Sequence, residues 1–130
     1  MLITDENISE AEIWRLREGG TRLRTISDVA IKSIQDDNIV SLLHRLKLPT
    51  LFTKDKHYGK YSLVHSGYCL VYLDVPEHEG RIAAFIRRFL HHHHFNTHSK
   101  RMGKVVRLHV RGIEFFEKGT RKSHAISWMT

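Results

Sequence analysis

The spacing of apolar residues changes along this chain in a way that predicts strands alternating with helices. Short apolar runs predict strands at residues 2–4, 22–26, 49–53, 69–74 and 104–110. Apolar residues at three- and four-residue spacing predict helices at residues 9–20, 36–47 and 76–95. Alternation of this kind favours a mostly parallel sheet with helices on both faces. We therefore expect an α/β fold, a three-layer α/β/α sandwich.

Local signals define the ends of the first predicted helix. Ser9 is the expected N-cap, Glu12 is its expected capping-box partner, and Gly19 with Gly20 should end the helix. The helix at 76–95 should be the longest because its apolar residues form one continuous stripe. Residues 1–117 are expected to form one domain, and residues 118–130 a loosely ordered C-terminal tail.

Length and composition indicate a folded single domain. The chain has 130 residues, of which 41% are hydrophobic, so it can bury one continuous core. Its one cysteine, Cys69, lies in an apolar run and is expected to be a core thiol in a reducing compartment. No apolar stretch approaches the roughly 20 residues of a membrane span, and no signal-peptide pattern opens the chain. We expect a cytoplasmic protein with no membrane partner.

Charge is divided unevenly between the two parts of the sequence. Residues 1–79 hold ten Lys or Arg against twelve Asp or Glu, a net charge of −2, whereas residues 80–130 hold eleven against two, a net charge of +9. Such a basic segment favours a polyanionic partner such as a nucleic acid, although many basic proteins bind no nucleic acid. The expected nucleic-acid contacts are Lys54, Arg87, Arg88, Lys100, Arg101 and Lys104.

Carboxylates follow the predicted strands at positions where a parallel sheet would bring them together. Asp5 and Glu6 follow the first strand, Asp55 follows the strand at 49–53, and Asp36 with Asp37 opens a helix. Ligands of open α/β sheets bind beyond the carboxyl ends of the strands. Clustered carboxylates repel one another unless protons or a cation neutralise them, and Mg²⁺ or Mn²⁺ prefers such oxygen ligands. The alternative is that these acids are helix caps and solvated strand ends.

Three short segments resemble the PIN-like proteins, a family that includes small members suspected as toxins of toxin-antitoxin pairs. The segments are LITDENIS, QDDNI and FTKDKHYG. The family pattern is an L-x-D-E-N strand segment, a helix-opening D-x-x-I, and a T-R/K-D-x-D-F element. The matching residues are Asp5, Glu6 and Asn7, then Asp36 with Ile39, then Thr53, Lys54 and Asp55.

This resemblance implies a PIN-like fold, a Mg²⁺- or Mn²⁺-dependent endoribonuclease activity and a cognate antitoxin. Asp5 and Asp55 would be the principal metal ligands and Asp36 the third, with Glu6 or Asp37 in an outer position. Asn7 and His57 would hold water or phosphate, and Lys54 with the late arginines would orient the RNA backbone. His57 stands where the family often has a second acid, which removes one anionic oxygen from the site. Small size and incompletely neutralised acids also suggest a homodimer.

Other functions stay open at this point. A receiver-type signalling domain also has an acid pair after its first strand and an aspartate after its third, where Asp55 would accept a phosphoryl group. A non-catalytic nucleic-acid or partner-binding protein would use the same acids only structurally. The run His91 to His94, with His98, offers imidazole ligands for a metal, but a solvated helix end is the more frequent explanation for such a run.

Overall fold

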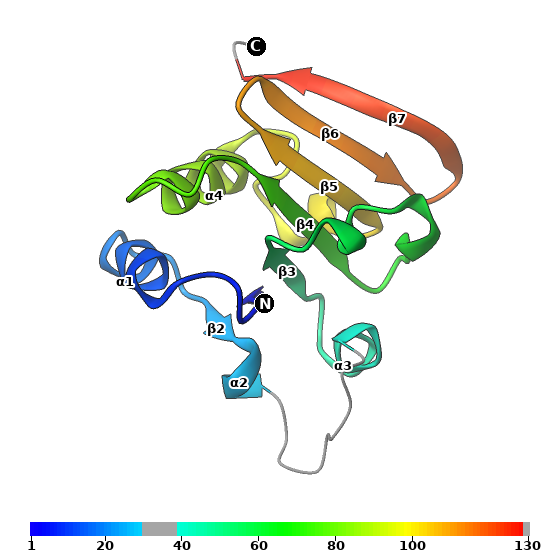
Figure 1. The fold of residues 1–130 in the computed structure, drawn as a ribbon. Helices are drawn as coiled ribbons and strands as arrows, with labels where there is room; N and C mark the ends of the chain where they lie inside the picture. Colours follow the sequence, from blue (N-terminus) through cyan, green and yellow to red (C-terminus); the bar gives the residue numbers. More distant parts are fainter. Residues whose placement is uncertain (30–38, 129–130) are drawn as a thin grey trace.

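A single seven-stranded sheet organises the computed structural model, which describes residues 1–29 and 39–128 (Figure 1). The strand order is β2-β1-β3-β4-β5-β6-β7; the first five strands are parallel, and β6 and β7 are antiparallel to their neighbours. The strands are β1 (Leu2–Thr4), β2 (Arg24–Thr25), β3 (Thr50–Thr53), β4 (Cys69–Asp74), β5 (Lys104–His109), β6 (Gly112–Glu117) and β7 (Thr120–Ser127). The predicted α/β class with a mostly parallel sheet is confirmed.

Helices and short 3-10 turns connect the strands. Those in the described ranges are α1 (Glu10–Glu18), α2 (Ile26–Val29), α3 (Ile39–Arg45), α4 (Arg81–His91), α5 (His98–Arg101), η1 (Lys56–Tyr58) and η2 (Tyr61–Leu63). The helix predicted at 36–47 starts at Ile39 among the described residues; Asp36 and Asp37 lie outside them. No helix in residues 1–29 and 39–128 has the length and apolarity that a membrane crossing requires.

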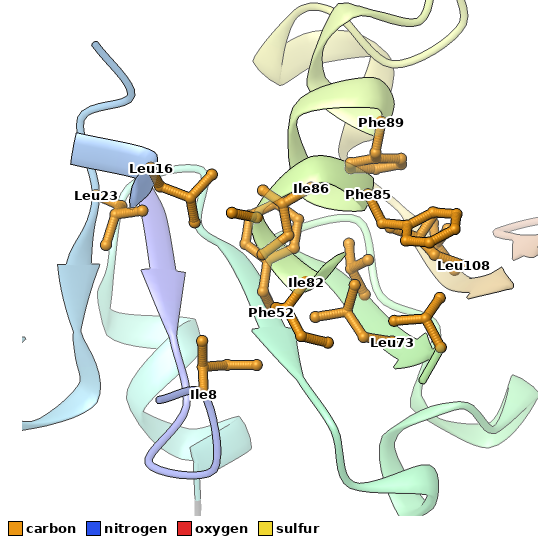
Figure 2. Packing of buried hydrophobic residues seen from close by; sticks show 14 of the residues in the cluster. Ile8, Leu16, Leu23, Phe52, Leu73, Ile82, Phe85, Ile86, Phe89 and Leu108 are labelled. Carbon is orange, nitrogen blue, oxygen red and sulfur yellow. The ribbon is translucent and has the colours of Figure 1, made fainter. Parts of the chain in front are cut away.

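Helices α1 and α4 pack side by side on one face of the sheet (Figures 1 and 2). Leu16 of α1 and Ile86 of α4 are fully buried against strand residues such as Phe52 and Leu108. Phe89 adds an edge-to-face ring contact with Phe52 at 6.0 Å between centroids. Burial of each such side chain contributes roughly 1.5–3 kcal/mol, so this face is the main apolar core.

The opposite face of the sheet carries a second, smaller apolar cluster. Leu42 and Leu43 of α3 pack there with Leu51, Leu70 and Val105, one residue from each of β3, β4 and β5. Neighbouring residues of a strand point to opposite faces, so Leu51 serves this cluster while Phe52 serves the other. Helices therefore flank the sheet on both sides, an arrangement consistent with a three-layer sandwich.

Glu12 links α1 to α4, and its side chain does not form the capping box expected from the sequence. Ser9 does cap α1, since its Oγ accepts a hydrogen bond from the Glu12 backbone N–H at 3.4 Å. The Glu12 carboxylate, however, accepts from the backbone N–H groups of Gly80 (3.1 Å) and Ala83 (3.2 Å). It satisfies two of the unpaired donors at the start of α4, and so fixes the two helices against each other.

The largest differences from the sequence-based expectation lie in the basic segment. The helix expected at 76–95 is shorter because Gly80, with φ of 77°, turns the chain just before α4, and α4 ends at His91. The strand expected at 104–110 is followed by a hairpin of β6 and β7 that turns at Gly119, whose φ is 95°. The expectation of a loose tail from residue 118 is therefore wrong for Thr120–Ser127, which pair with β6.

Candidate functional site

The candidate site lies where the chain connections change from one face of the sheet to the other. β1 lies between β2 and β3, the two strands that follow it in the chain. The connection through α1 packs on one face and the connection through α2 and α3 on the opposite face. Ligands of open α/β sheets bind at such switch points, beyond the carboxyl ends of the strands. Asp5 follows β1 and Lys54 with Asp55 follows β3, so these residues meet at that position.

Thr53 is the centre of the hydrogen-bond network at this switch point. Its buried Oγ1 accepts from the Asp55 backbone N–H at 3.0 Å and from Asn7 Nδ2 at 3.3 Å. Its hydroxyl hydrogen is directed at Asp5 Oδ2, 2.8 Å away. A hydroxyl has one hydrogen and two lone pairs, so these three contacts use its full capacity and fix the direction of the proton.

Asn7 ties the segment after β1 to the segment after β3. Its Oδ1 accepts from the Lys54 backbone N–H at 3.0 Å while its Nδ2 donates to Thr53. The Asp5 backbone N–H also donates to the Phe52 carbonyl at 2.9 Å, which extends the β1–β3 pairing past β1. The site is therefore held by backbone and side-chain bonds from both strands, and the relative positions of Asp5 and Asp55 are fixed.

Asp5 is a buried carboxylate without a cationic partner among the described residues. The residue is 8% exposed, and no Lys, Arg or His in residues 1–29 and 39–128 forms an ion pair with it. Oδ1 accepts one bond, from the Glu6 backbone N–H at 2.8 Å, and Oδ2 accepts the Thr53 hydroxyl. Each carboxylate oxygen has two lone-pair sites, so both oxygens keep capacity for one more partner. Burial of an uncompensated charge is costly, and a cation at this position would offset that cost.

Asp55 caps the 3-10 turn η1 and is oriented by His57. Its Oδ1 accepts from the His57 backbone N–H at 2.9 Å and lies 2.7 Å from His57 Nδ1. The pKa of Asp55 is below its ordinary value, first because of the backbone bond from His57 and then because of the imidazole. His57, expected to hold water or phosphate, is bonded to Asp55 and contributes to the lowered pKa of that carboxylate.

Two tyrosines, which the sequence did not single out as site residues, report how the acids are arranged. The pKa of Tyr58 is raised first by burial and then by the charges of Asp5 and Asp55. The pKa of Tyr72 is raised by burial, by Asp74 and, to a smaller degree, by Asp55. The charges of Asp5 and Asp55 thus both reach the Tyr58 phenol. The sequence placed Tyr72 only within an apolar run, and Tyr58 only at the Phe position of the family's T-R/K-D-x-D-F element.

The ligand atoms present suit a hard divalent cation. Asp5 and Asp55 supply carboxylate oxygens. The Thr53 hydroxyl bonds the Asp5 carboxylate and the Asp55 backbone, and Asn7 bonds Thr53 and the Lys54 backbone. Mg²⁺ commonly uses one or two protein carboxylates with water and substrate phosphate, so this set fits it. No group of three or more His, Cys, Asp or Glu suited to a metal occurs in residues 1–29 and 39–128, and the expected third acid, Asp36, lies outside them.

A cleft of about 580 Å³ opens beside the site, between the starts of α1 and α4. Glu6, Asn7 and Lys54 line it together with Arg15 and Ile82. The Lys54 side chain is only 14% exposed and pairs with Glu77, and burial lowers its pKa. Lys54 therefore lies next to the carboxylates as expected, but in this structure its charge is already paired.

Several basic residues predicted to contact nucleic acid lie elsewhere. Arg101 is 4% exposed, with Nε bonded to Thr50 Oγ1 (3.2 Å) and Nη1 to the Phe95 carbonyl (2.8 Å), so it is a buried structural cation. Lys104 begins β5 and Lys100 precedes it, which places both at the N-terminal ends of the parallel strands, opposite Asp5.

The two neighbouring arginines of α4 have different environments. Arg87 donates to the Arg15 carbonyl and lies against Gly19, so it is engaged between α1 and α4. Arg88 is exposed, and its guanidinium carbon is 4.4 Å from the Trp128 ring centroid. Of the predicted contacts on α4, Arg88 alone is presented to solvent.

The histidine run forms a stack of rings at the end of α4. His92, His93 and His94 have ring centroids 4.3–5.3 Å apart. The pKa of His92 is lowered first by burial and then by its two neighbours. Within the described residues the run does not form a metal-binding group. His91, His93 and His94 are exposed at or just after the end of α4, the position expected for a solvated helix end.

Comparison with known proteins leaves the function to be argued from the site itself. A scan against protein-family models finds no match to this chain, and searches of curated proteins and of solved structures also find none. The resemblance of the three short segments to PIN-like proteins therefore stays a prediction. The geometry at the ends of β1 and β3 is the physical basis on which a function can be proposed.

Proposed function

We propose that this chain is a PIN-like, metal-dependent endoribonuclease. The observation that carries the proposal concerns Asp5, which is buried and has no cationic partner in the described residues. Its carboxylate accepts a hydrogen bond from the Thr53 hydroxyl, and the same hydroxyl oxygen accepts the Asp55 backbone N–H at the start of η1. A structural helix cap or solvated strand end needs neither the burial nor the convergence. A site for a divalent cation needs both.

Each residue of the site has a role in this proposal. Asp5 and Asp55 would hold the cation, with Asn7 and Thr53 fixing the chain segments that carry them. The PIN-like resemblance implies Asp36, which lies outside the described residues, as the third ligand. His57 orients Asp55 through its bonds to Oδ1 and lowers the pKa of that carboxylate. A bound Mg²⁺ or Mn²⁺ would activate water and neutralise the charge that develops on the scissile phosphate. Glu6 lines the adjacent cleft, where it is placed to accept a proton or bind an outer-sphere water.

A cleavage assay with matched variants tests the proposal. Labelled single-stranded RNA is incubated with the protein and Mg²⁺, Mn²⁺ or EDTA. Cleavage should require the cation and should fall at least about a hundredfold in Asp5→Asn, since removal of a principal charged ligand removes several kcal/mol of stabilisation of the transition state. Asp28→Asn, at an exposed carboxylate on α2, should cleave like the wild type. Equal activity of Asp5→Asn and Asp28→Asn would refute the proposal.

The toxin role, the cognate antitoxin and the homodimer are proposals that rest on the PIN-like resemblance. They predict that expression of the wild type arrests growth and that expression of Asp5→Asn does not. Arrest by both forms would point instead to the non-catalytic binding function, in which the acids are structural.

One observation favours a second function, that of a phosphoryl-accepting receiver domain. The parallel strands follow the order β2-β1-β3-β4-β5, the doubly wound order that receivers share, with Asp55 soon after β3. Against this, Asp55 Oδ1 is engaged by the η1 turn, and β5 ends in His109 where a receiver uses a late lysine. Incubation with a small acyl phosphate decides: stoichiometric phosphorylation of Asp55 would favour the receiver function, and its absence the nuclease.

A further inference from the structure

Two arginines and two aromatic rings form a strip along α4. The Arg81 and Arg88 guanidinium carbons lie 5.3 Å and 5.6 Å from the Phe85 ring centroid. Arg88 also lies over Trp128, at 4.4 Å, and the Trp128 ring contacts Phe85 with 5.8 Å between centroids. We call Arg81, Phe85, Arg88 and Trp128 the α4 strip.

The cations of the α4 strip are not paired with acids. Neither Arg81 nor Arg88 forms an ion pair with any carboxylate of residues 1–29 and 39–128, and both are exposed. Exposed Arg111 adds a further charge next to the strip, since its carbonyl accepts the Trp128 backbone N–H at 3.3 Å. The sequence from Gly80 to Ile113 contains no carboxylate. This surface is therefore a cationic patch that no acid of its own segment neutralises.

The α4 strip starts beside the candidate site. Ile82, the residue after Arg81, lines the cleft that Asn7 and Lys54 also line. Glu12 holds the first turn of α4 in this position through Gly80 and Ala83. The distance from Arg81 to Arg88 is about 10 Å along the helix axis, at roughly 1.5 Å per residue. The strip thus leads away from the cleft over a length that suits a short run of nucleotides.

We propose that the α4 strip binds the single-stranded segment of RNA that flanks the scissile bond. This inference rests on the proposed nuclease function for the identity of the ligand. Guanidinium groups match phosphate geometry bidentately, and their planes stack on unpaired bases. Stacking on aromatic and guanidinium planes combined with backbone charge is the usual means of binding single strands without strict sequence preference. Phe85 is buried and supports the arginines from the core side, so bases would stack on the exposed guanidinium planes and on the half-buried Trp128 ring. The bases of duplex RNA are stacked inside the double helix, so a duplex would interact with the strip only through its phosphate charges.

A purely structural role makes a different prediction. Arg88 covers Phe85 and Trp128, and such a cation-aromatic contact makes a small contribution to stability at an exposed position. If this were its only role, Arg88→Gln would lower the melting temperature and leave RNA affinity unchanged. Arg88→Lys keeps the charge and loses the planar group, and so separates stacking from simple attraction.

The test is the salt dependence of RNA binding in a background that cannot cleave. Asp5→Asn protein is titrated against a fluorescent single-stranded RNA at several KCl concentrations, with and without Arg81→Gln and Arg88→Gln together. Loss of two phosphate contacts should reduce the slope of log K against log salt by about 1.4 and weaken binding tenfold or more at low salt. Arg24→Gln with Arg45→Gln removes the same charge from exposed positions in β2 and α3 and should leave the slope nearly unchanged.

Each outcome decides one of the two proposals. An unchanged salt-dependence slope and an unchanged RNA affinity in the Arg81/Arg88 variant would refute the proposal that the α4 strip binds RNA. Binding of duplex RNA as tightly as single-stranded RNA would also refute it. If the strip binds RNA but wild-type protein with Mn²⁺ never cleaves it, the nuclease function fails, and what stands is binding of single-stranded RNA by the strip without a scissile bond beside it. If wild-type protein cleaves and the Arg81/Arg88 variant shows the same KM, the nuclease stands and the strip fails.

Discussion

The Thr53 hydroxyl donates to Asp5 Oδ2 across the β1–β3 boundary, over 2.8 Å between two buried residues. The same oxygen accepts the Asp55 backbone N–H, so one hydroxyl orients the carboxylate after β1 and the chain that carries the carboxylate after β3. These acids come from distant positions in the sequence, and one neutral side chain fixes the carboxylate of Asp5 and the backbone of Asp55. The proposed cation site depends on this bond.

Replacement of Thr53 should therefore be costly. Thr53→Val removes the donor to Asp5 and the acceptor for Asp55 and Asn7, and leaves buried polar groups without partners. We expect the free energy of unfolding in urea to fall by about 1–3 kcal/mol. Thr4→Val is the matched control, because Thr4 is equally buried but its Oγ1 has no hydrogen-bond partner among the described residues. That variant should be neutral or slightly stabilising, and equal losses in the two would contradict the network.

The bond between Glu12 and the start of α4 predicts a pH-dependent contribution to stability. Burial raises the pKa of Glu12, but bonds from Ala83, Arg15 and Gly80 outweigh it and hold the pKa below its ordinary value. A depressed folded-state pKa means that the stabilisation is complete above the unfolded value and is lost as pH falls through the folded value.

Glu12→Gln should accordingly be about 1–3 kcal/mol less stable than the wild type at pH 7. The difference should shrink as pH falls below about 4.5, the ordinary value for this group. Urea unfolding of both proteins between pH 3 and pH 7 measures it. A difference that is constant across this range, or that grows toward acid, would show that the carboxylate charge is not what caps α4.

The burial of Arg101 predicts a loss of stability and no loss of RNA binding. Arg101→Gln removes the bonds to Thr50 and to the Phe95 carbonyl, at a cost of about 1.5–3 kcal/mol because the donor is charged. The slope of RNA affinity against salt should match that of the wild type under conditions where both are folded. A smaller slope would mean that Arg101 reaches phosphate despite its burial.

His57 should govern the titration of Asp55. His57→Ala removes the imidazole but keeps the backbone N–H that bonds to Oδ1, which is the larger cause of the lowered pKa. The pKa of Asp55 should rise in the variant and still lie below the ordinary value of 3.8. Carboxyl ¹³C chemical shifts followed from pH 2 to pH 7 measure it. An unchanged pKa would remove His57 from the site.

Buried parallel strands were the part of the fold most accessible from sequence. The run at residues 69–74 matches β4, because a strand covered on both faces is apolar throughout. β7 was not predicted, since an edge strand with mostly exposed residues carries no apolar pattern. The helix at 76–95 was predicted too long because Phe95 is buried and stacks on Phe89 from beyond the helix end, at 4.8 Å.

Only the site residues that closely follow a strand could be predicted from the sequence. The positions of Asp5 and Asp55 after neighbouring parallel strands follow from their places in the sequence and from the rule on carboxyl ends. The role of Thr53 as the shared donor and acceptor depends on the register of β3 with β1, which no local pattern reveals. Arg101 was placed on the surface because it belongs to a basic run, and its partners Thr50 and Phe95 become neighbours only through tertiary packing.

Direct titration of Mn²⁺ tests the central claim, that Asp5 and Asp55 hold one divalent cation between them. Mn²⁺ binding is followed by its electron paramagnetic resonance signal in the wild type, Asp5→Asn, Asp55→Asn and the double variant, with Asp28→Asn as control. One ion per chain should bind in the wild type and in Asp28→Asn. Each single site variant should weaken binding at least about tenfold, since one charged ligand contributes more than about 1.4 kcal/mol, and the double variant should be little worse than either single one. Equal affinity in the wild type and both single variants would contradict the account.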